Sequence, residues 1–173
     1  PERTGVGMSA MGRIGPGEDD AGVPVYSFNV VFACASFDGA GRITSLNIDQ
    51  LEVATPNYDG EDMPEFSGFP GQGGYAKWDD AAGKTSGKTE DTDEAYLDEI
   101  SAWTTKRMRG DNYRLASGTW AEQMDRYERL FTGMTVEEIE AWVGRYCSDV
   151  NGRPLSEKSS MEGDGEKYAA LSD

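Results

Sequence analysis

Residues 25–37 read VYSFNVVFACASF, and this stretch decides the fold. Apolar side chains that recur at every second position lie on one face of a strand, and here they are Tyr26, Phe28, Val30, Phe32 and Cys34. The opposite face carries small apolar side chains at Val31, Ala33 and Ala35. The pattern therefore predicts a central strand that is covered on both faces.

A second strand is predicted at residues 42–53, because the turn signal DGAG at residues 38–41 separates it from the first. Its apolar positions change parity twice, which predicts a bulge or sharp twist near residues 44–45 or 49–50. The two strands together form a long β-hairpin.

Two segments beside the hairpin lack clear periodicity. Residues 1–24 are rich in glycine and proline and are interpreted as an extended lead-in. Residues 54–90 hold three prolines and two glycine-rich runs, which is typical of a long loop with room for one short strand. Loops of this length in compact domains are usually functional or disordered.

Three amphipathic helices are predicted after residue 90, each opened by a polar residue with a glutamate three positions later. The expected capping pairs are Asp91 with Glu94, Thr119 with Glu122, and Thr135 with Glu138. The helices are expected to end at Gly110, at Gly133 and at Asn151–Gly152, respectively.

These elements predict an α+β fold, with a small antiparallel sheet built on a long β-hairpin and packed against about three helices. One domain is expected over residues 1–152, because a chain of 173 residues falls within the usual size of a single domain. Residues 153–173 form a polar segment with a helical hint at residues 166–171.

The net charge limits the partners of the protein. The chain holds 16 basic and 32 acidic residues, for a formal charge of −16, so it repels the phosphates of nucleic acids and of anionic lipids. No run approaches the roughly 18 apolar residues of a membrane span, so no direct span is expected and any membrane tether is expected upstream of the chain. A high net charge also keeps a surface soluble.

The chain contains no histidine, which excludes Ser-His-Asp triads and histidine-based zinc sites. We find no catalytic constellation, so a non-enzymatic role is the favoured interpretation. The two cysteines, Cys34 and Cys147, fit no CxxC motif and leave two alternatives open, buried thiols or a strand-to-helix disulfide.

Three polar motifs favour structural interpretations. The basic cluster formed by Lys106, Arg107, Arg109 and Arg114 is expected to complement the dipole at a helix C-terminus rather than to bind phosphate. Residues 68–74 lack the spacing of a phosphate-binding loop and are interpreted as a plain loop. Residues 59–62, and Asp149 with Asn151, offer oxygen ligands without the spacing of an EF-hand, so no metal site is assigned.

Residues 117–120 read SGTW and allow two interpretations. A glycine-flanked hydroxyl at a helix start lies among unpaired N–H groups, which favour a phosphate or another anion. The simpler interpretation is an N-cap at Thr119 with Trp120 in the core.

Several short motifs resemble a known family when they are taken together. They are Thr4-Gly5-Val6-Gly7, residues 31–45, Ile48-Asp49, Thr105-Lys106, Asp111-Asn112-Tyr113, residues 120–123 and residues 131–135. In this combination the chain resembles secreted FMN-binding-domain or pheromone-type lipoproteins of Gram-positive anaerobes. The resemblance covers most of residues 4–150.

The resemblance implies an extracytoplasmic location, secreted or in the cell envelope, and a link to extracellular electron transfer. In some relatives FMN is attached through a phosphoester to a threonine in a Ser/Thr-Gly-Ala-Thr motif. This motif does not occur here, because Ser117-Gly118-Thr119 lacks the alanine, and a motif downstream of Asp173 is compatible with the resemblance. The expected flavin cleft is formed by Tyr113, Ser117, Thr119 and Trp120, since rings suit isoalloxazine and a helix start suits phosphate.

A second interpretation remains open. A structural or interaction domain of the cell envelope would bind a protein or glycan partner through residues 54–90 and exposed aromatic side chains. The absent attachment motif favours this alternative, whereas the family resemblance favours the flavoprotein.

Overall fold

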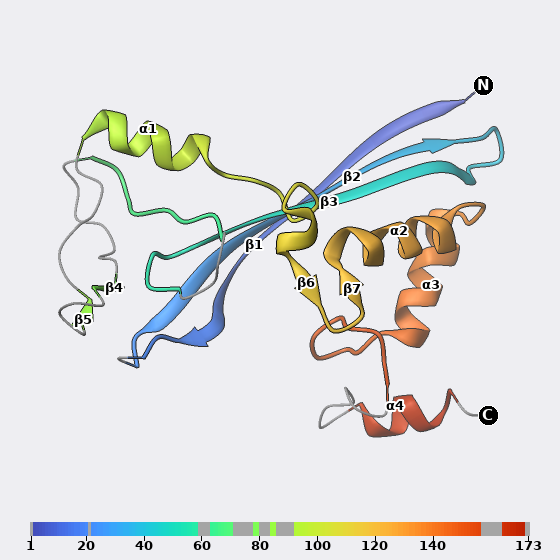
Figure 1. Cartoon of the computed structure of the whole chain (residues 1–173). Helices are drawn as coiled ribbons and strands as arrows, with labels where there is room; N and C mark the ends of the chain where they lie inside the picture. The colour runs from blue at the N-terminus through green and yellow to red at the C-terminus, as the bar shows by residue number, and fades with distance from the viewer. Residues whose placement is uncertain are drawn as a thin grey trace. The chain divides into compact units, whose positions relative to one another are not determined.

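The structure is a computed structural model that describes residues 2–20, 22–58, 63–70, 78–79, 84–85, 92–156 and 164–171. Its strands are β1 (Arg3–Glu18), β2 (Pro24–Phe37), β3 (Ile43–Ala54), β4 (Trp78–Asp79), β5 (Lys84–Thr85), β6 (Arg114–Leu115) and β7 (Gly118–Thr119). Its helices are α1 (Asp93–Ser101), the 3-10 helix η1 (Gly110–Asn112), α2 (Trp120–Phe131), α3 (Val136–Tyr146) and α4 (Gly165–Ala169) (Figure 1). The fold is α+β with antiparallel sheets, as predicted.

The largest sheet has the strand order β1-β2-β3, which confirms β2 as the central strand (Figure 1). The turn between β2 and β3 is the predicted one, because the Asp38 carboxylate accepts hydrogen bonds from Ala40 N at 2.8 Å and Arg42 N at 2.9 Å. Gly41 has φ +80°, a conformation that favours glycine. Backbone hydrogen bonds from Arg42, followed by those from Ala40 and Gly41, hold the pKa of Asp38 below its ordinary value. The predicted bulge in β3 stays a prediction.

Two segments contain more strand than the sequence indicated. The expected lead-in contains the 16-residue strand β1, in which glycines separate the apolar side chains and obscure the alternation. Within residues 54–90, two short strands pair antiparallel, β4 with β5, where one was predicted. In the same segment Ala54 forms a parallel bridge with Glu65. Residues 71–77 of the glycine-rich loop lie outside the described residues.

The chain divides into two compact units. Unit 1 comprises Pro1–Gly5, Ala35–Leu46 and Glu128–Asp173, and unit 2 comprises Val6–Cys34 and Asn47–Tyr127. The predicted domain boundary at residue 152 stays a prediction. Among the described residues, no helix combines the length and apolar character needed to span a bilayer.

The prediction that β2 is covered on both faces was wrong for the face that carries Phe28 and Phe32. Phe28 is 52% exposed and Phe32 39%, whereas Ser27 and Asn29 on the opposite face are both 5% exposed. Polar side chains can be buried here because they are hydrogen-bonded. Gln50 donates to Asn29 Oδ1 at 2.7 Å, and Asn29 donates to Ser27 Oγ at 3.2 Å. The covered face of β2 therefore carries the polar Ser27 and Asn29 beside the buried Val25.

Both cysteine thiols are unbonded, so the disulfide alternative was wrong. Cys34 is exposed, which also contradicts a buried thiol in β2, while Cys147 is 5% exposed. Burial raises the pKa of the Cys147 thiol, so it stays protonated near neutral pH.

The predicted beginnings of α2 and α3 are confirmed, whereas the predicted ends of α1 and α3 were wrong. Thr135 and Glu138 form the predicted capping box of α3. Asp91 lies outside the described residues, and Thr92 caps α1 by accepting from Ala95 N at 3.2 Å. α1 ends at Ser101 instead of Gly110, and α3 ends at Tyr146, before Asn151. The helical hint near the end corresponds to α4.

Unit 1 is held by aromatic and polar contacts. The Trp142 ring lies 5.4 Å from Phe131 and 5.5 Å from Tyr146 between centroids. Ser148 Oγ donates to the buried Asp164 carboxylate at 2.5 Å, which connects the segment around α4 to the end of α3. Arg42 pairs with Glu138 at 2.9 Å, and hydrogen bonds from the Thr135 backbone and then from Arg42 lower the pKa of Glu138.

Candidate functional site

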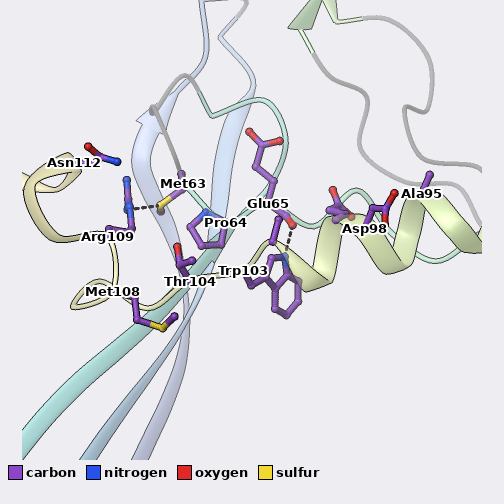
Figure 2. A pocket seen from close by; sticks show the side chains of 12 residues that line it. Met63, Pro64, Glu65, Ala95, Asp98, Trp103, Thr104, Met108, Arg109 and Asn112 are labelled. Atoms are coloured by element: carbon purple, nitrogen blue, oxygen red, sulfur yellow. Dashed lines mark hydrogen bonds between the residues drawn. The ribbon is translucent and has the colours of Figure 1, made fainter.

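A cleft of about 690 Å³ lies within unit 2. Its walls come from residues 63–65, from α1 and from the chain that follows α1 as far as Asn112. Figure 2 shows Arg109 pointing toward Met63 near one end of this cleft, whereas Asp98 lies on α1 toward the other end. The cleft thus has a cationic end and an acidic end.

The cleft exists because α1 stops early. The helix ends where Ala102 N donates to the carbonyl oxygens of Asp98 and Glu99. Groups that follow it in the chain donate to residues outside the helix. The Trp103 indole donates to Glu65 O at 2.8 Å, and Lys106 N donates to Gln50 O at 2.7 Å. The bond from Lys106 N thus replaces a helical bond that the sequence pattern suggested, and the Trp103 side chain is anchored outside the helix.

One wall of the cleft is fixed by Glu99. Its carboxylate accepts from Ser67 N at 3.0 Å and from Ser67 Oγ at 2.6 Å, and Ser67 is completely buried. Phe66 packs edge-on against Trp103 with ring centroids 6.2 Å apart. The wall is therefore pre-formed rather than assembled around a ligand.

Arg109 lines the cationic end and is only 9% exposed. Its guanidinium carbon lies 4.5 Å from the centroid of the Tyr113 ring, and Nη1 donates to Met63 Sδ at 3.6 Å. Lys106 Nζ lies 5.3 Å from the same ring centroid. A cation above an aromatic ring is attracted by the ring quadrupole, so Tyr113 holds two cations in place.

A buried ion cluster adjoins this aromatic ring. Glu52 is 3% exposed and pairs with Lys106 at 2.6 Å and with Arg13 at 2.5 Å. Burial alone would raise the pKa of Glu52, but hydrogen bonds and charges from Lys106 and Arg13 outweigh it and the pKa lies below its ordinary value. Glu52 is therefore ionised at neutral pH and fixes Lys106.

The four residues expected to form a flavin cleft lie in and around the short hairpin β6-β7 and the start of α2. Tyr113 contacts Arg109, and its carbonyl accepts from Trp120 N at 3.2 Å. Ser117 is exposed, whereas Thr119 and Trp120 are buried at 6% and 8% exposure. Only Tyr113 is thus connected to the cleft, through Arg109.

The start of α2 is already capped by its own residues. Thr119 Oγ1 accepts from Glu122 N at 3.1 Å, and the Glu122 carboxylate accepts from Thr119 N at 2.8 Å. The same carboxylate lies 2.5 Å from the position of a Cβ at Gly118. The predicted N-cap is confirmed, and a carboxylate from the chain lies where an external anion would bind.

Replacing Thr119 by alanine should lower the free energy of unfolding by about 1 kcal/mol, because the cap of α2 is lost. The measurement is the urea midpoint at constant m-value. Ser117→Ala is the control, since its exposed side chain lies two positions away, and it should change stability by less than about 0.5 kcal/mol. Equal losses for both variants would contradict the assigned cap.

The basic cluster does not lie at a helix C-terminus, so the dipole interpretation was wrong. α1 ends before it, and each cation has partners elsewhere. Arg107 pairs with Asp125 at 2.7 Å, and Arg114 pairs with Asp111 at 3.0 Å. The structural role itself is supported for Lys106, Arg107 and Arg114, through their ion pairs.

The described residues contain no group of three or more potential metal ligands of the His, Cys, Asp or Glu type. Residues 59–62, one of the two oxygen-rich motifs, lie outside the described part. Asp149, in the other motif, pairs with Lys167 at 2.7 Å.

The sequence reasoning missed Met63, Glu65 and Trp103 as components of a site. No local pattern marks them, because Trp103 carries a helical periodicity and residues 63–65 belong to an irregular segment. The available signal is that Thr104, Thr105 and Gly110 are weak helix formers. They lie beside Trp103 and Arg109 in the sequence.

The sequence of the chain is similar to that of a protein named as a reductase. Over 137 residues it is 32% identical to a protein of Desulfitobacterium hafniense named chlorophenol reductase. The match covers 74% of this chain and 34% of the relative, so the chain spans about a third of the length of that curated protein. No protein-family model matches the chain. No solved structure matches it either.

Proposed function

We propose that this chain is a domain of a cell-envelope redox protein, related to FMN-carrying lipoproteins, that positions a flavin and does not itself catalyse a reaction. The observation that carries the proposal is the 32% identity over 137 residues to a protein named chlorophenol reductase. A reductase delivers electrons to its substrate, and the family resemblance of the motifs also points to electron transfer. A domain that holds a redox cofactor accounts for both similarities.

The cleft in unit 2 fits the ring system of a flavin better than the start of α2 does. Its volume of about 690 Å³ falls within the range of small-molecule sites. Trp103 offers an aromatic surface, and Arg109 offers a cation at one end for a phosphate. The acidic residues Glu65 and Asp98 would disfavour the phosphate near them, so its expected position is beside Arg109.

The protein's own residues would bind and orient the cofactor, while the flavin, when bound, would supply the redox chemistry. Arg109 is held by Tyr113, and Trp103 is held by Glu65 O, so both contacts are pre-organised. Because the chain lacks histidine, it offers no imidazole to shuttle protons near neutral pH. This composition suits a carrier of electrons rather than an acid–base catalyst.

The location proposed is extracytoplasmic, as in the lipoproteins that the chain resembles. Net charge of −16 is compatible with an exposed position in an envelope. The activity of the whole protein, its electron donor and its acceptor belong to this proposal as well, since the chain covers about a third of the relative.

FMN titration of the 173-residue chain tests the assignment of the cleft. Quenching of flavin fluorescence should reveal binding, and Arg109→Gln should raise the dissociation constant about tenfold or more through loss of a phosphate contact. Arg114→Gln is the matched control, because Arg114 is exposed and does not line the cleft, and it should leave binding unchanged.

The native full-length protein provides the second measurement. A visible flavin spectrum together with a flavin-sized mass excess is expected if the cofactor is retained. A colourless native protein, with a chain that ignores added FMN, would refute the flavin proposal. Weaker binding for Ser117→Ala but not for Arg109→Gln would move the site to the start of α2.

The alternative function, an interaction domain, is favoured by a separate observation. Several large apolar side chains of β1 and β2 are exposed, including Met8 at 69% and Phe28 at 52%. Exposed apolar surface of this kind is typical of sites that contact another protein.

A further inference from the structure

One face of the sheet in unit 2 is apolar and exposed. We call it the outer face and define it by Val6, Met8, Ile14, Phe28 and Phe32, which are 80%, 69%, 70%, 52% and 39% exposed. Arg13 donates to Ser27 at 3.1 Å on the opposite face of the sheet. Because side chains alternate along a strand, the adjacent residues Ile14 and Phe28 point to the outer face. Ser27 and Asn29 on the opposite face are buried whereas these five apolar side chains are exposed, which is the reverse of the usual arrangement.

The two edges of the same sheet differ. On the β3 side, Lys106 N donates to Gln50 O at 2.7 Å, the Arg107 guanidinium donates to Ile48 O at 3.2 Å, and Ala54 bonds to the segment 64–66. On the other side, β2 is the single neighbour of β1 among the described strands, at the blue end of the ribbon in Figure 1. Among the described residues, no backbone hydrogen bond links β1 to anything beyond the sheet. Edge strands with unpaired N–H and C=O groups are templates for another strand.

The charge distribution selects the kind of molecule that fits this edge. The chain holds 32 acidic residues, yet residues 3–17 and 21–37 contain none of them. Within residues 6–17 the single charged side chain is Arg13, which is already paired with Glu52. The edge and the outer face thus form a neutral, apolar surface on an otherwise strongly acidic chain, and they suit a neutral, apolar partner strand.

We propose that β1 pairs antiparallel with β1 of a second copy of this chain, as the interface of a homodimer. Apart from Arg13, which is paired with Glu52, residues 6–17 are uncharged and are apolar or small, so this strand is complementary to itself. A twofold axis at Ala10 places Val6 opposite Ile14 of the second copy, and an axis at Met11 places Met8 opposite Ile14. Both arrangements bring the outer faces of the two copies into one continuous sheet.

Pairing of β1 with β1 of a second copy limits the assembly to two copies. A twofold contact uses the same edge of both copies, so no exposed edge of this sheet remains on the β1 side. Each copy keeps its charge of −16, and these charges repel one another across the dimer. Added salt screens this repulsion without weakening an apolar, hydrogen-bonded contact, so dimerisation should become stronger as the salt concentration rises.

Sedimentation equilibrium of the whole chain at low and high salt tests the proposal. The expected result is a monomer–dimer equilibrium whose dimer fraction increases with salt. Ile14→Lys and Met8→Lys should each raise the dimer dissociation constant about tenfold or more, because a lysine on an edge strand opposes pairing. Met108→Lys is the matched control, since Met108 is 70% exposed and lies outside the strand, and it should leave the constant unchanged.

Amide hydrogen exchange of the unmodified chain provides a measurement that needs no variant. Exchange within residues 6–15 should slow as the protein concentration rises. A chain that stays monomeric at all concentrations and salts overturns the proposal. So does a dimer that weakens with salt or that tolerates both lysine substitutions. None of these results bears on flavin binding, which is measured separately.

Discussion

Replacement of Glu52 by glutamine is expected to lower the free energy of unfolding by about 3 kcal/mol. Glu52 is 3% exposed and neutralises Lys106, which is 8% exposed and lies 2.6 Å away. Removal of one member of a buried pair leaves the other charge uncompensated, and such losses measure about 3–5 kcal/mol. A loss at the lower end of this range is expected, because Arg13, the second partner of Glu52, is half exposed and can be hydrated instead. Urea unfolding gives the value directly.

Two further variants separate the buried pair from ordinary surface charge. Asp111→Asn removes an exposed pair with Arg114 and should change stability by less than about 1 kcal/mol. Lys106→Met added to Glu52→Gln should recover part of the loss, because the uncompensated charge is then gone. A loss below about 1 kcal/mol for Glu52→Gln would show that Glu52 does not hold Lys106 in this way.

The same cluster should make stability depend on pH. The folded state lowers the pKa of Glu52 below its ordinary value of 4.5, so its stabilisation is complete above that value. It is lost as the pH falls through the folded pKa, when the carboxylate becomes protonated. The difference in unfolding free energy between the unmodified chain and Glu52→Gln should therefore be constant near neutral pH and shrink below pH 4.5.

The parts of the fold that the sequence predicted are those set by local interactions. Thr135 and Glu138 lie three residues apart, and their capping box needs nothing else from the chain. The same holds for Thr119 with Glu122, and for the turn that Asp38 closes. These residues marked the beginnings of α2 and α3 and the β2-β3 hairpin.

The parts that failed depend on distant partners. Alternation identifies two faces of β2 but cannot say which is covered, and Asn29 is buried because Gln50 from β3 reaches it. The end of α1 was misplaced because Trp103 and Lys106 bond to Glu65 and Gln50, far away in the sequence. The cleft could not be predicted for the same reason, because its walls form only when these distant residues are in contact.

Trp120→Ala is expected to lower the free energy of unfolding by about 3–5 kcal/mol, the usual range for removal of a buried large aromatic side chain. Trp120 is 8% exposed at the start of α2, and its backbone N–H is held by Tyr113 O. Phe28→Ala in the same unit is the matched comparison. Phe28 is 52% exposed, so its loss should be well under half as large.

This pair of variants decides between two interpretations of the aromatic residues. If the apolar face of β2 were the core, as the alternation predicted, Phe28→Ala would be about as costly as Trp120→Ala. Thermal or urea unfolding that ranks Phe28 equal to Trp120 would therefore contradict the polar, covered face formed by Ser27 and Asn29. Trp120→Phe keeps most of the buried area, so any loss of FMN binding in that variant would report a ligand contact rather than unfolding. With the flavin in the cleft, binding by Trp120→Phe should be unchanged, because Trp120 does not line it.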